Sequence, residues 1–210
     1  ELRFLFLNEN LIESIDSRCF SPCYYLKFVD FSSNNLKELS ESLFESNSQI
    51  EHIYLSFNQL TSLPAKLFRN LAKLKQLKLD SNQLDTIDSK AFSDCVNLEQ
   101  VLLNSNRLRA IDSSDLFAAC TNLIELRLDD NQIERIDERA FESCRQLKRL
   151  WLNKNKIREF PHRSKLFSYS TNLRHLYLND NLFLEVDLKI FLNCKNLKSL
   201  NLDHHILKKK

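Results

Sequence analysis

Cysteine and histidine carry the most distinctive chemistry in this sequence, because they can act as nucleophiles, proton carriers or metal ligands. The 210 residues include six cysteines and five histidines, and no two cysteines have the Cys-x-x-Cys spacing typical of structural zinc sites. The most metal-like group is His204 and His205 with Asp203, which Asp180 and His175 join when the repeats described below are aligned. We expect solvated polar side chains there, and we predict no metal and no cofactor.

The motifs of the common enzyme classes are missing. The chain has no glycine. This excludes the nucleophile elbow, the P-loop and the dinucleotide-binding fingerprint, since each needs glycine for a tight turn or a close backbone approach. The metalloprotease motif His-Glu-x-x-His is also missing. We therefore predict that the chain is not an enzyme, and we assign no catalytic residue.

Charge and hydropathy argue against two kinds of partner. The 30 basic and 28 acidic residues give a formal net charge of +2, which is too balanced to indicate a surface for nucleic acid or for anionic lipid. No apolar run approaches the ~20 residues that a membrane-spanning helix needs. We expect no nucleic-acid partner and no direct insertion into a membrane.

An internal repeat dominates the chain. The motif Leu-x-x-Leu-x-Leu-x-x-Asn-x-Leu returns at intervals of 24 to 26 residues, as in LKQLKLDSNQL (74–84). The copies begin at residues 2, 26, 50, 74, 98, 123, 147 and 173, and a partial ninth begins at 197. Such a period is typical of a solenoid in which each copy forms one coil. We predict one domain over residues 1–210.

The strand of each coil follows from the x-Leu-x-Leu-x stretch. Alternation with a period of two places one face of a strand inside and the other outside. Stacked copies would form a parallel sheet with one open face. Because about 24 residues per coil leave little room for a full helix, the return path on the opposite side should consist of extended segments and short 3₁₀ turns.

Two further columns of side chains belong to the framework. An asparagine follows each strand where the chain turns inward, and its amide can satisfy backbone groups that have no sheet partner. The predicted asparagine ladder comprises Asn10, Asn34, Asn58, Asn82, Asn106, Asn131, Asn155 and Asn181, with His205 in its place in the ninth copy. A phenylalanine column should fill the core on the other side and comprises Phe20, Phe44, Phe68, Phe92, Phe117, Phe141, Phe167 and Phe191.

These motifs resemble the "typical" 24-residue class of leucine-rich repeats, and the stretch TSLPAKLFRNLAK (61–73) closely matches the consensus of that class. The resemblance implies an α/β solenoid, a right-handed leucine-rich-repeat horseshoe with a parallel β-sheet on the concave face and short 3₁₀ or extended segments on the convex face. It also implies a recognition module that binds a protein ligand or co-receptor through the concave face, with dimerisation possible. That class is found mostly in extracellular proteins such as Toll-like receptors and adhesion proteins, so the resemblance implies an extracellular or cell-surface ectodomain with a role in innate immunity or cell adhesion.

The sequence departs from the family pattern in two ways. Most copies have aspartate where the consensus has proline, as in Asp16, Asp88 and Asp137. The cysteine-rich caps that usually flank extracellular arrays are also missing, and the first motif begins at Leu2. Terminal coils need polar caps to shield the core. We therefore interpret the sequence as part of a larger protein.

Five cysteines occupy one repeat position, where Leu71 stands in the third copy; they are Cys23, Cys95, Cys120, Cys144 and Cys194. We interpret this column as buried free thiols that replace leucine, because parallel side chains on neighbouring coils suit stacking better than bonding. None of the 21 asparagines lies in an Asn-x-Ser/Thr sequon. Both features keep a cytosolic scaffold open as an alternative, and a purely structural spacer is a third possibility.

The outward positions of the strands form the candidate binding face. Its aromatic and basic side chains cluster toward the two ends, with a polar middle, and clustered exposed aromatics and arginines are typical of binding hot spots. The predicted ligand-binding residues are Phe28, Tyr54 and Phe57 toward one end and Arg127, Arg149, Trp151, Lys154, His175 and Tyr177 toward the other. Phe4 and Phe6 extend the first group, although neighbouring coils could cover them. The two extra residues of the seventh copy, within 160–167, predict a bulge on the convex side.

Overall fold

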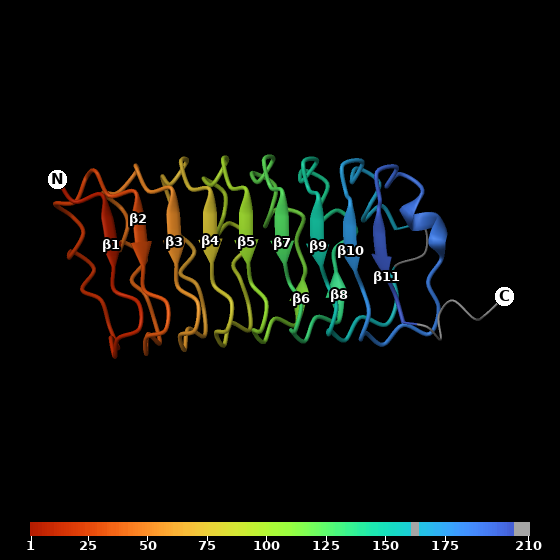
Figure 1. Ribbon diagram of the computed structural model, residues 1–210, viewed down its shortest axis with the longest axis horizontal. Coiled ribbons are helices and arrows are strands. Elements are labelled where there is room, and N and C mark those ends of the chain that lie inside the picture. Colours follow the sequence, from red (N-terminus) through yellow and green to blue (C-terminus); the bar gives the residue numbers. More distant parts are fainter. Residues whose placement is uncertain (161–163, 204–210) are drawn as a thin grey trace.

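The computed structural model describes residues 1–160 and 164–203. One parallel sheet of nine short strands runs along the whole molecule, with every neighbouring pair of strands in parallel register (Figure 1). The predicted leucine-rich-repeat solenoid is therefore confirmed. In spatial order the strands are β1 (Phe4–Phe6), β2 (Phe28–Asp30), β3 (His52–Tyr54), β4 (Gln76–Lys78), β5 (Gln100–Leu102), β7 (Glu125–Arg127), β9 (Arg149–Trp151), β10 (His175–Tyr177) and β11 (Ser199–Asn201).

Each strand of this sheet is three residues long, because side chains point alternately inward and outward only in the central part of each copy. In β3 the central residue Ile53 is buried while His52 and Tyr54 are half-buried on the open side. The same pattern holds in β2, β4, β5, β7 and β10. Side chains of neighbouring coils therefore form straight columns across the sheet.

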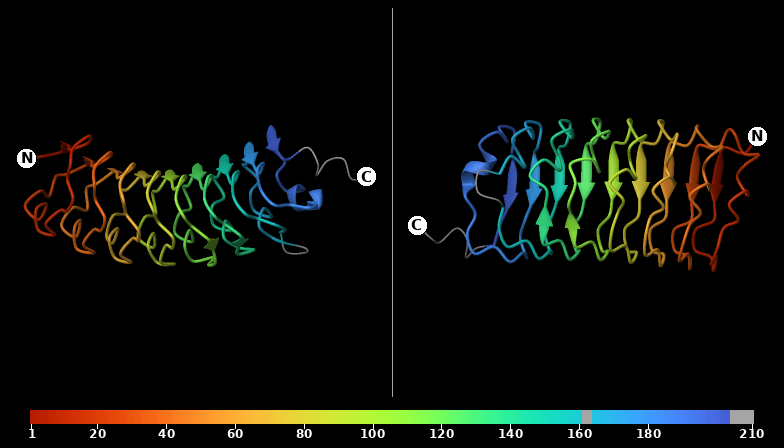
Figure 2. Two further views of the ribbon diagram at one scale, coloured as in Figure 1. Left: turned by 90° about the horizontal axis from the view of Figure 1, so that it is seen from below. Right: turned by 180° about the vertical axis from the view of Figure 1, so that it is seen from behind.

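The sheet lies on the concave side of a gently curved molecule, and the return segments lie opposite (Figure 2). The core fills the space between these two layers. Phenylalanines stack along it from coil to coil, with ring centroids 6.0 Å apart for Phe68 and Phe92 and 5.9 Å apart for Phe92 and Phe117. Stacked rings of this kind join each coil to the next through apolar contact.

The return segments contain little regular structure. Within residues 1–160 and 164–203 they hold one 3₁₀ helix, η1 (Leu188–Phe191), and one two-stranded parallel sheet of β6 (Ala110–Ile111) and β8 (Arg135–Ile136). Asp187 begins η1 by accepting a hydrogen bond from the backbone N–H of Lys189. The described residues form no helix of the length and apolarity that crossing a membrane requires.

A column of left-handed residues turns the chain out of each strand. The residue before the ladder asparagine has φ between 55° and 57° in eight coils, and Asn70 is a ninth residue with positive φ. Since the chain has no glycine, side chains with a β-carbon take up this conformation. The eight residues are Glu9, Ser33, Phe57, Ser81, Ser105, Asp130, Lys154 and Asp180.

Candidate functional site on the concave face

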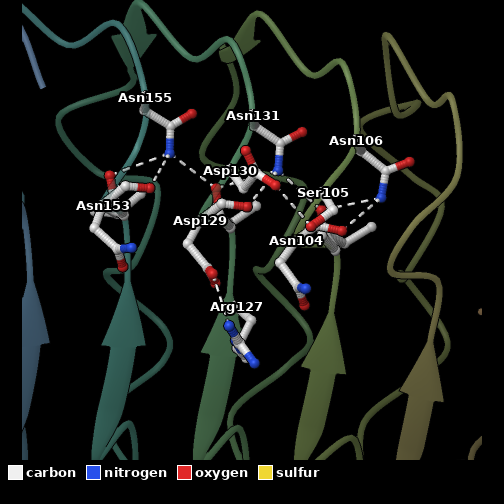
Figure 3. Close-up of polar contacts among 12 residues, drawn as sticks. Asn104, Ser105, Asn106, Arg127, Asp129, Asp130, Asn131, Asn153 and Asn155 are labelled. Atoms are coloured by element: carbon white, nitrogen blue, oxygen red, sulfur yellow. Dashed lines mark hydrogen bonds and ion pairs between the residues drawn. The ribbon is translucent and has the colours of Figure 1, made fainter. Parts of the chain in front are cut away.

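The asparagine ladder fixes the position of each strand end. The Asn106 Nδ2 group donates to the carbonyl of Leu103 in its own coil and to that of Leu79 in the preceding coil, at 3.1 and 3.0 Å. Its Oδ1 atom accepts from the backbone N–H of Leu84, at 3.0 Å. Figure 3 shows Asn106, Asn131 and Asn155 side by side in this arrangement. Asn34, Asn58, Asn82, Asn131, Asn155 and Asn181 make the equivalent bonds and are buried.

Asn10 departs from the expected buried geometry. It is exposed and donates to the carbonyls of Leu7 and Asn8 in its own coil. The physical reason is its place in the first coil of the described chain, where no preceding coil supplies a partner. His204 and His205 lie outside the described residues, and so does the middle of the expected bulge, residues 161–163.

One aromatic cluster lies on the open face of β1, β2 and β3. The Phe28 ring centroid is 4.9 Å from that of Phe6 and 5.0 Å from that of Tyr54. Tyr54 donates its hydroxyl to Gln76 Oε1 at 2.7 Å, and Lys78 Nζ lies 3.7 Å from the centre of the Tyr54 ring. The cluster is therefore ordered by its own contacts. Phe57 stands beyond the end of β3, and 59% of it is exposed.

A second cluster lies on β7, β9 and β10. The Trp151 and Tyr177 rings are stacked with their centroids 5.4 Å apart and their planes 7° apart. The Arg127 guanidinium lies 5.4 Å from the centre of the Trp151 ring. Strand register places these three residues on consecutive coils. They form a continuous stack of guanidinium, indole and phenol along the face.

Carboxylates that the sequence analysis did not single out hold both arginines of this cluster. Asp129, which is only 6% exposed, accepts from Arg127 Nε and Nη2 at 2.9 and 2.7 Å (Figure 3). This hydrogen bonding raises the pKa of Arg127 further above its ordinary value. Glu125 accepts from Arg149 Nε at 2.9 Å. Arg127 and Asp129 are two residues apart in the sequence, and Glu125 and Arg149 share a repeat position on neighbouring coils. These spacings between opposite charges are the signal that could have identified the two pairs.

The remaining predicted residues surround the second cluster. His175 is half-buried and pairs in register with Arg149 on the neighbouring strand. Lys154 is exposed in the left-handed column and lies beside the strand that carries Trp151. The structure therefore groups Arg127, Arg149, Trp151, Lys154, His175 and Tyr177 within three consecutive coils, and groups Phe28, Tyr54 and Phe57 within two others.

A shallow polar hollow separates the two clusters. Its volume is about 140 Å³, and it lies over β4, β5, β7 and β9. It is lined by Gln76, Glu99, Gln100, Ile124, Glu125 and Arg149. The concave face therefore carries two aromatic clusters with a hydrophilic centre between them.

The edge of the sheet where the strands begin carries charged residues. Glu51 accepts from Lys75 Nζ at 2.8 Å and from Lys27 Nζ at 3.1 Å. The hydrogen bonds from Lys75 and Lys27 lower the pKa of Glu51 to about 2. These contacts join three successive coils, which shows that side chains at this repeat position lie next to one another.

The cysteines provide no reactive site in this face. All six are free thiols; four are buried and Cys19 is exposed. Burial raises the pKa of Cys120 to about 12 and that of Cys194 to about 11, which keeps both protonated and unreactive. Within residues 1–160 and 164–203, no group of three histidine, cysteine or acidic side chains is placed to hold a metal ion.

This parallel solenoid, with its asparagine ladder and open concave face, defines a leucine-rich-repeat protein of the recognition class. The model of the BspA type leucine-rich-repeat region matches residues 2–114 and 105–209, with six copies, and the chain belongs to that family. No curated protein matches the sequence.

Solved structures include similar solenoids. The chain is 29% identical to a chain of the TLR13–ssRNA13 complex, with a TM-score of 0.86 over 96% of this chain and 29% of that one. It is 25% identical to a chain of the octameric complex of Latrophilin 3, Unc5D and FLRT2, with a TM-score of 0.65 over 85% of this chain and 61% of the other. A leucine-rich-repeat protein of Leptospira interrogans is 24% identical, with a TM-score of 0.82 over 95% of this chain and 48% of that one. The chain thus spans less than two thirds of each of these relatives.

Proposed function

We propose that this chain binds a protein ligand through its concave face, as part of the ectodomain of a receptor or secreted protein in immunity or adhesion. The observation that carries the proposal is the stack of Arg127, Trp151 and Tyr177 on the open face of the sheet. The core does not require these side chains, because the buried central residues of the same strands, Leu126, Leu150 and Leu176, already fill it. Aromatic and arginine side chains that are already ordered lose little conformational entropy on binding.

The structural neighbours support this class of function. The neighbour with FLRT2 was solved in a complex of several proteins, and another neighbour is a Toll–Spätzle complex from Drosophila. The TLR13 neighbour was solved with RNA. We favour a protein over RNA for this chain because its charge is balanced and both arginines of the second cluster are paired with carboxylates. The free thiols favour a cytosolic scaffold with the same binding face as the second candidate.

Site-specific photo-crosslinking tests the proposal. A photoreactive phenylalanine derivative replaces Tyr177 on the concave face or, as the control, the exposed Tyr25 outside the sheet. After exposure to an extract and to the secreted proteins of the source cells, we expect a specific protein adduct from position 177 only. The purified captured protein should then lose binding to Trp151→Ala while the melting temperature of that variant stays within a few degrees of the original.

Two results would contradict the proposal. The first is equal crosslinking from positions 25 and 177. The second is unchanged affinity of Trp151→Ala for the captured protein. A crosslink from position 177 to RNA rather than to protein would replace the protein ligand with a nucleic acid.

A further inference from the structure

The concave face of the last three coils has different charges along its two long edges. Where the strands begin, consecutive coils carry Lys148, Arg174 and Lys198, and none of these side chains has an ion pair within the described part of the chain. The contacts of Glu51 with Lys27 and Lys75 show how close side chains at this position lie on neighbouring coils. The hollow lined by Glu99, Ile124 and strand residues shows that this position borders the concave face.

The opposite edge carries acidic side chains. Asp129 lies there and faces Arg127, which places its repeat position beside the open face. At the same position on neighbouring coils, Asn104 Oδ1, Asn153 Oδ1 and Asp203 Oδ2 are buried and have no hydrogen-bond partner among the described residues, so Asp203 contributes the charge of its carboxylate to this edge rather than a free acceptor. Figure 3 shows the side chains of Asn104 and Asn153 directed like that of Asp129. In the adjacent left-handed column, the carboxylates of Asp130 and Asp180 outnumber the one cation, Lys154.

The dimensions of this face suit an α-helix. Lys148 and Asn153 are five positions apart in the sequence, which corresponds to ~17 Å between the two edges, while a helix with its side chains is ~10–12 Å wide. Neighbouring coils are ~4.8 Å apart, and one helical turn rises ~5.4 Å. A helix lying along the solenoid would therefore place about one turn over each coil.

We propose that the partner contributes an amphipathic helix that lies lengthwise over the Arg127–Trp151–Tyr177 stack, with an acidic flank facing Lys148, Arg174 and Lys198 and a basic flank facing Asp180 and Asp203. Acidic side chains at helix positions i, i+4 and i+7 meet the three cations, one per coil. The apolar stripe of the helix covers Trp151 and Tyr177. This inference rests on the proposed function and adds the chemistry and the direction of the partner.

The direction of the helix follows from its charges. Turning a helix end over end, with its apolar stripe still on the sheet, exchanges the edges that its two flanks face. Only one direction places acid against the cations and base against the carboxylates. The edges of the face therefore select a direction as well as a composition.

Synthetic helical peptides of about 18 residues, or five turns, provide the probe. The first has a leucine stripe with one glutamate flank and one lysine flank. The second has glutamate on both flanks, and the third has lysine on both. By fluorescence anisotropy in low salt, we expect the first to bind about tenfold or more tightly than the other two, with the difference shrinking as salt screens the edges.

Charge reversal in the protein provides the matching variants. Lys148→Glu, Arg174→Glu and Lys198→Glu together should weaken binding of the first peptide about tenfold or more. Arg69→Glu, Arg139→Glu and Lys165→Glu, at exposed positions outside the sheet, should leave it unchanged. If the reversed protein melts early, glutamine at the same three positions serves instead. A nitroxide on the peptide N-terminus should broaden NMR signals of coils at one end of the stack, and at the other end when the two flanks of the peptide are exchanged.

The outcomes separate this inference from the proposed function. Equal affinities of the three peptides, no effect of reversal, or no binding of any peptide would overturn the helix and its polarity. Concave-face recognition would still stand if crosslinking from position 177 and the effect of Trp151→Ala on the captured protein hold. If those also fail, the proposed function falls with it.

Discussion

At the scale of single residues, Phe57 combines an exposed aromatic ring with a left-handed backbone. Its φ is 55°, and 59% of the residue is exposed. The left-handed conformation costs most residues with a β-carbon about 1–2 kcal/mol of free energy, whereas asparagine and aspartate adopt it more easily. Serine and aspartate occupy most other positions of the column. An exposed aromatic residue in a costly conformation agrees with the proposed binding role of this face.

Replacing Phe57 with asparagine should therefore stabilise the protein. We expect the free energy of unfolding to rise by about 1 kcal/mol, because the left-handed conformation becomes easier to adopt and little buried surface is lost. Urea denaturation measures the change, and Asp130→Asn at the same repeat position is the control with little effect, because aspartate already tolerates this conformation. A clear loss of stability in Phe57→Asn would show that the ring contributes to the fold.

The asparagine ladder predicts a large and position-dependent effect. Asn106→Ala should lower the free energy of unfolding by about 3 kcal/mol, because the buried carbonyls of Leu79 and Leu103 and the N–H of Leu84 lose their partners. Asn10→Ala is the matched control and should cost less than about 1 kcal/mol, since Asn10 is exposed. Similar losses in the two variants, measured by urea denaturation, would contradict this account.

At the scale of the elements, neighbouring strands are joined by charges at the edge of the sheet. The pKa of Glu51 is lowered to about 2 from an ordinary value of 4.5 by Lys75 and Lys27. A carboxylate whose pKa is lower in the folded state stabilises that state fully above its unfolded pKa. This contribution decreases as the pH falls from about 4.5 to about 2.

Glu51→Gln should accordingly reduce the acid sensitivity of the fold. Between pH 5 and pH 2 we expect the urea midpoint of the original protein to fall more steeply than that of the variant. Glu99→Gln, at the same repeat position two coils further on, should keep the original slope, because Glu99 has no ion pair within the described residues. Parallel pH profiles for Glu51→Gln and the original protein would refute the proposed linkage.

The strands and their columns could be predicted because their signal repeats. The alternation around Leu77 and Ile53 recurs in each copy, and the repeat length fixes which residues share a column. The ion pairs of the second cluster could not be predicted with the same certainty. Glutamate occurs only once in the column of Glu125, whereas aspartate also occurs at Asp80 and Asp203 in the column of Asp129. An ion pair depends on the rotamers of both side chains rather than on backbone periodicity.

The small sheet of β6 and β8 was not predicted for a related reason. Its strands contain two residues each, too few to show alternation. It forms where the copy beginning at 98 has one residue more than its neighbours, so that its return path differs from those of the other coils. A local change in length alters hydrogen bonding without leaving a pattern in the residue types.

At the scale of the whole molecule, each coil contacts only its neighbours, so the central coils are covered on both sides. In the cysteine column, Cys95, Cys120 and Cys144 are completely buried, whereas Cys23, in the first coil, is half-buried. Leu5 and Leu7 in the first coil are also only partly buried. Stability in such a solenoid is a sum of coil and interface contributions.

Thiol labelling should report this gradient. With a disulfide reagent under native conditions we expect Cys19 to react first, Cys23 next, and Cys95, Cys120 and Cys144 only as the solenoid unfolds. The raised pKa of Cys120, about 12, further suppresses its reaction. Mass spectrometry of digested samples assigns each site, and labelling in urea is the control in which all six react. Early reaction of Cys120 in the native protein would contradict a continuous core.

The regular spacing of the coils also means that the distance between the two aromatic clusters is set by the number of coils between them. Phe28 and Tyr54 lie five coils from Trp151 and Tyr177, which corresponds to ~24 Å at ~4.8 Å per coil. Duplication of one 24-residue copy in the middle would move the two clusters apart by one coil, or ~4.8 Å, and loss of one copy would bring them closer by the same distance. Neither cluster would change its own structure. A lineage of such proteins could follow a partner that grows or shrinks by copying a segment of gene, without altering any residue that touches the partner.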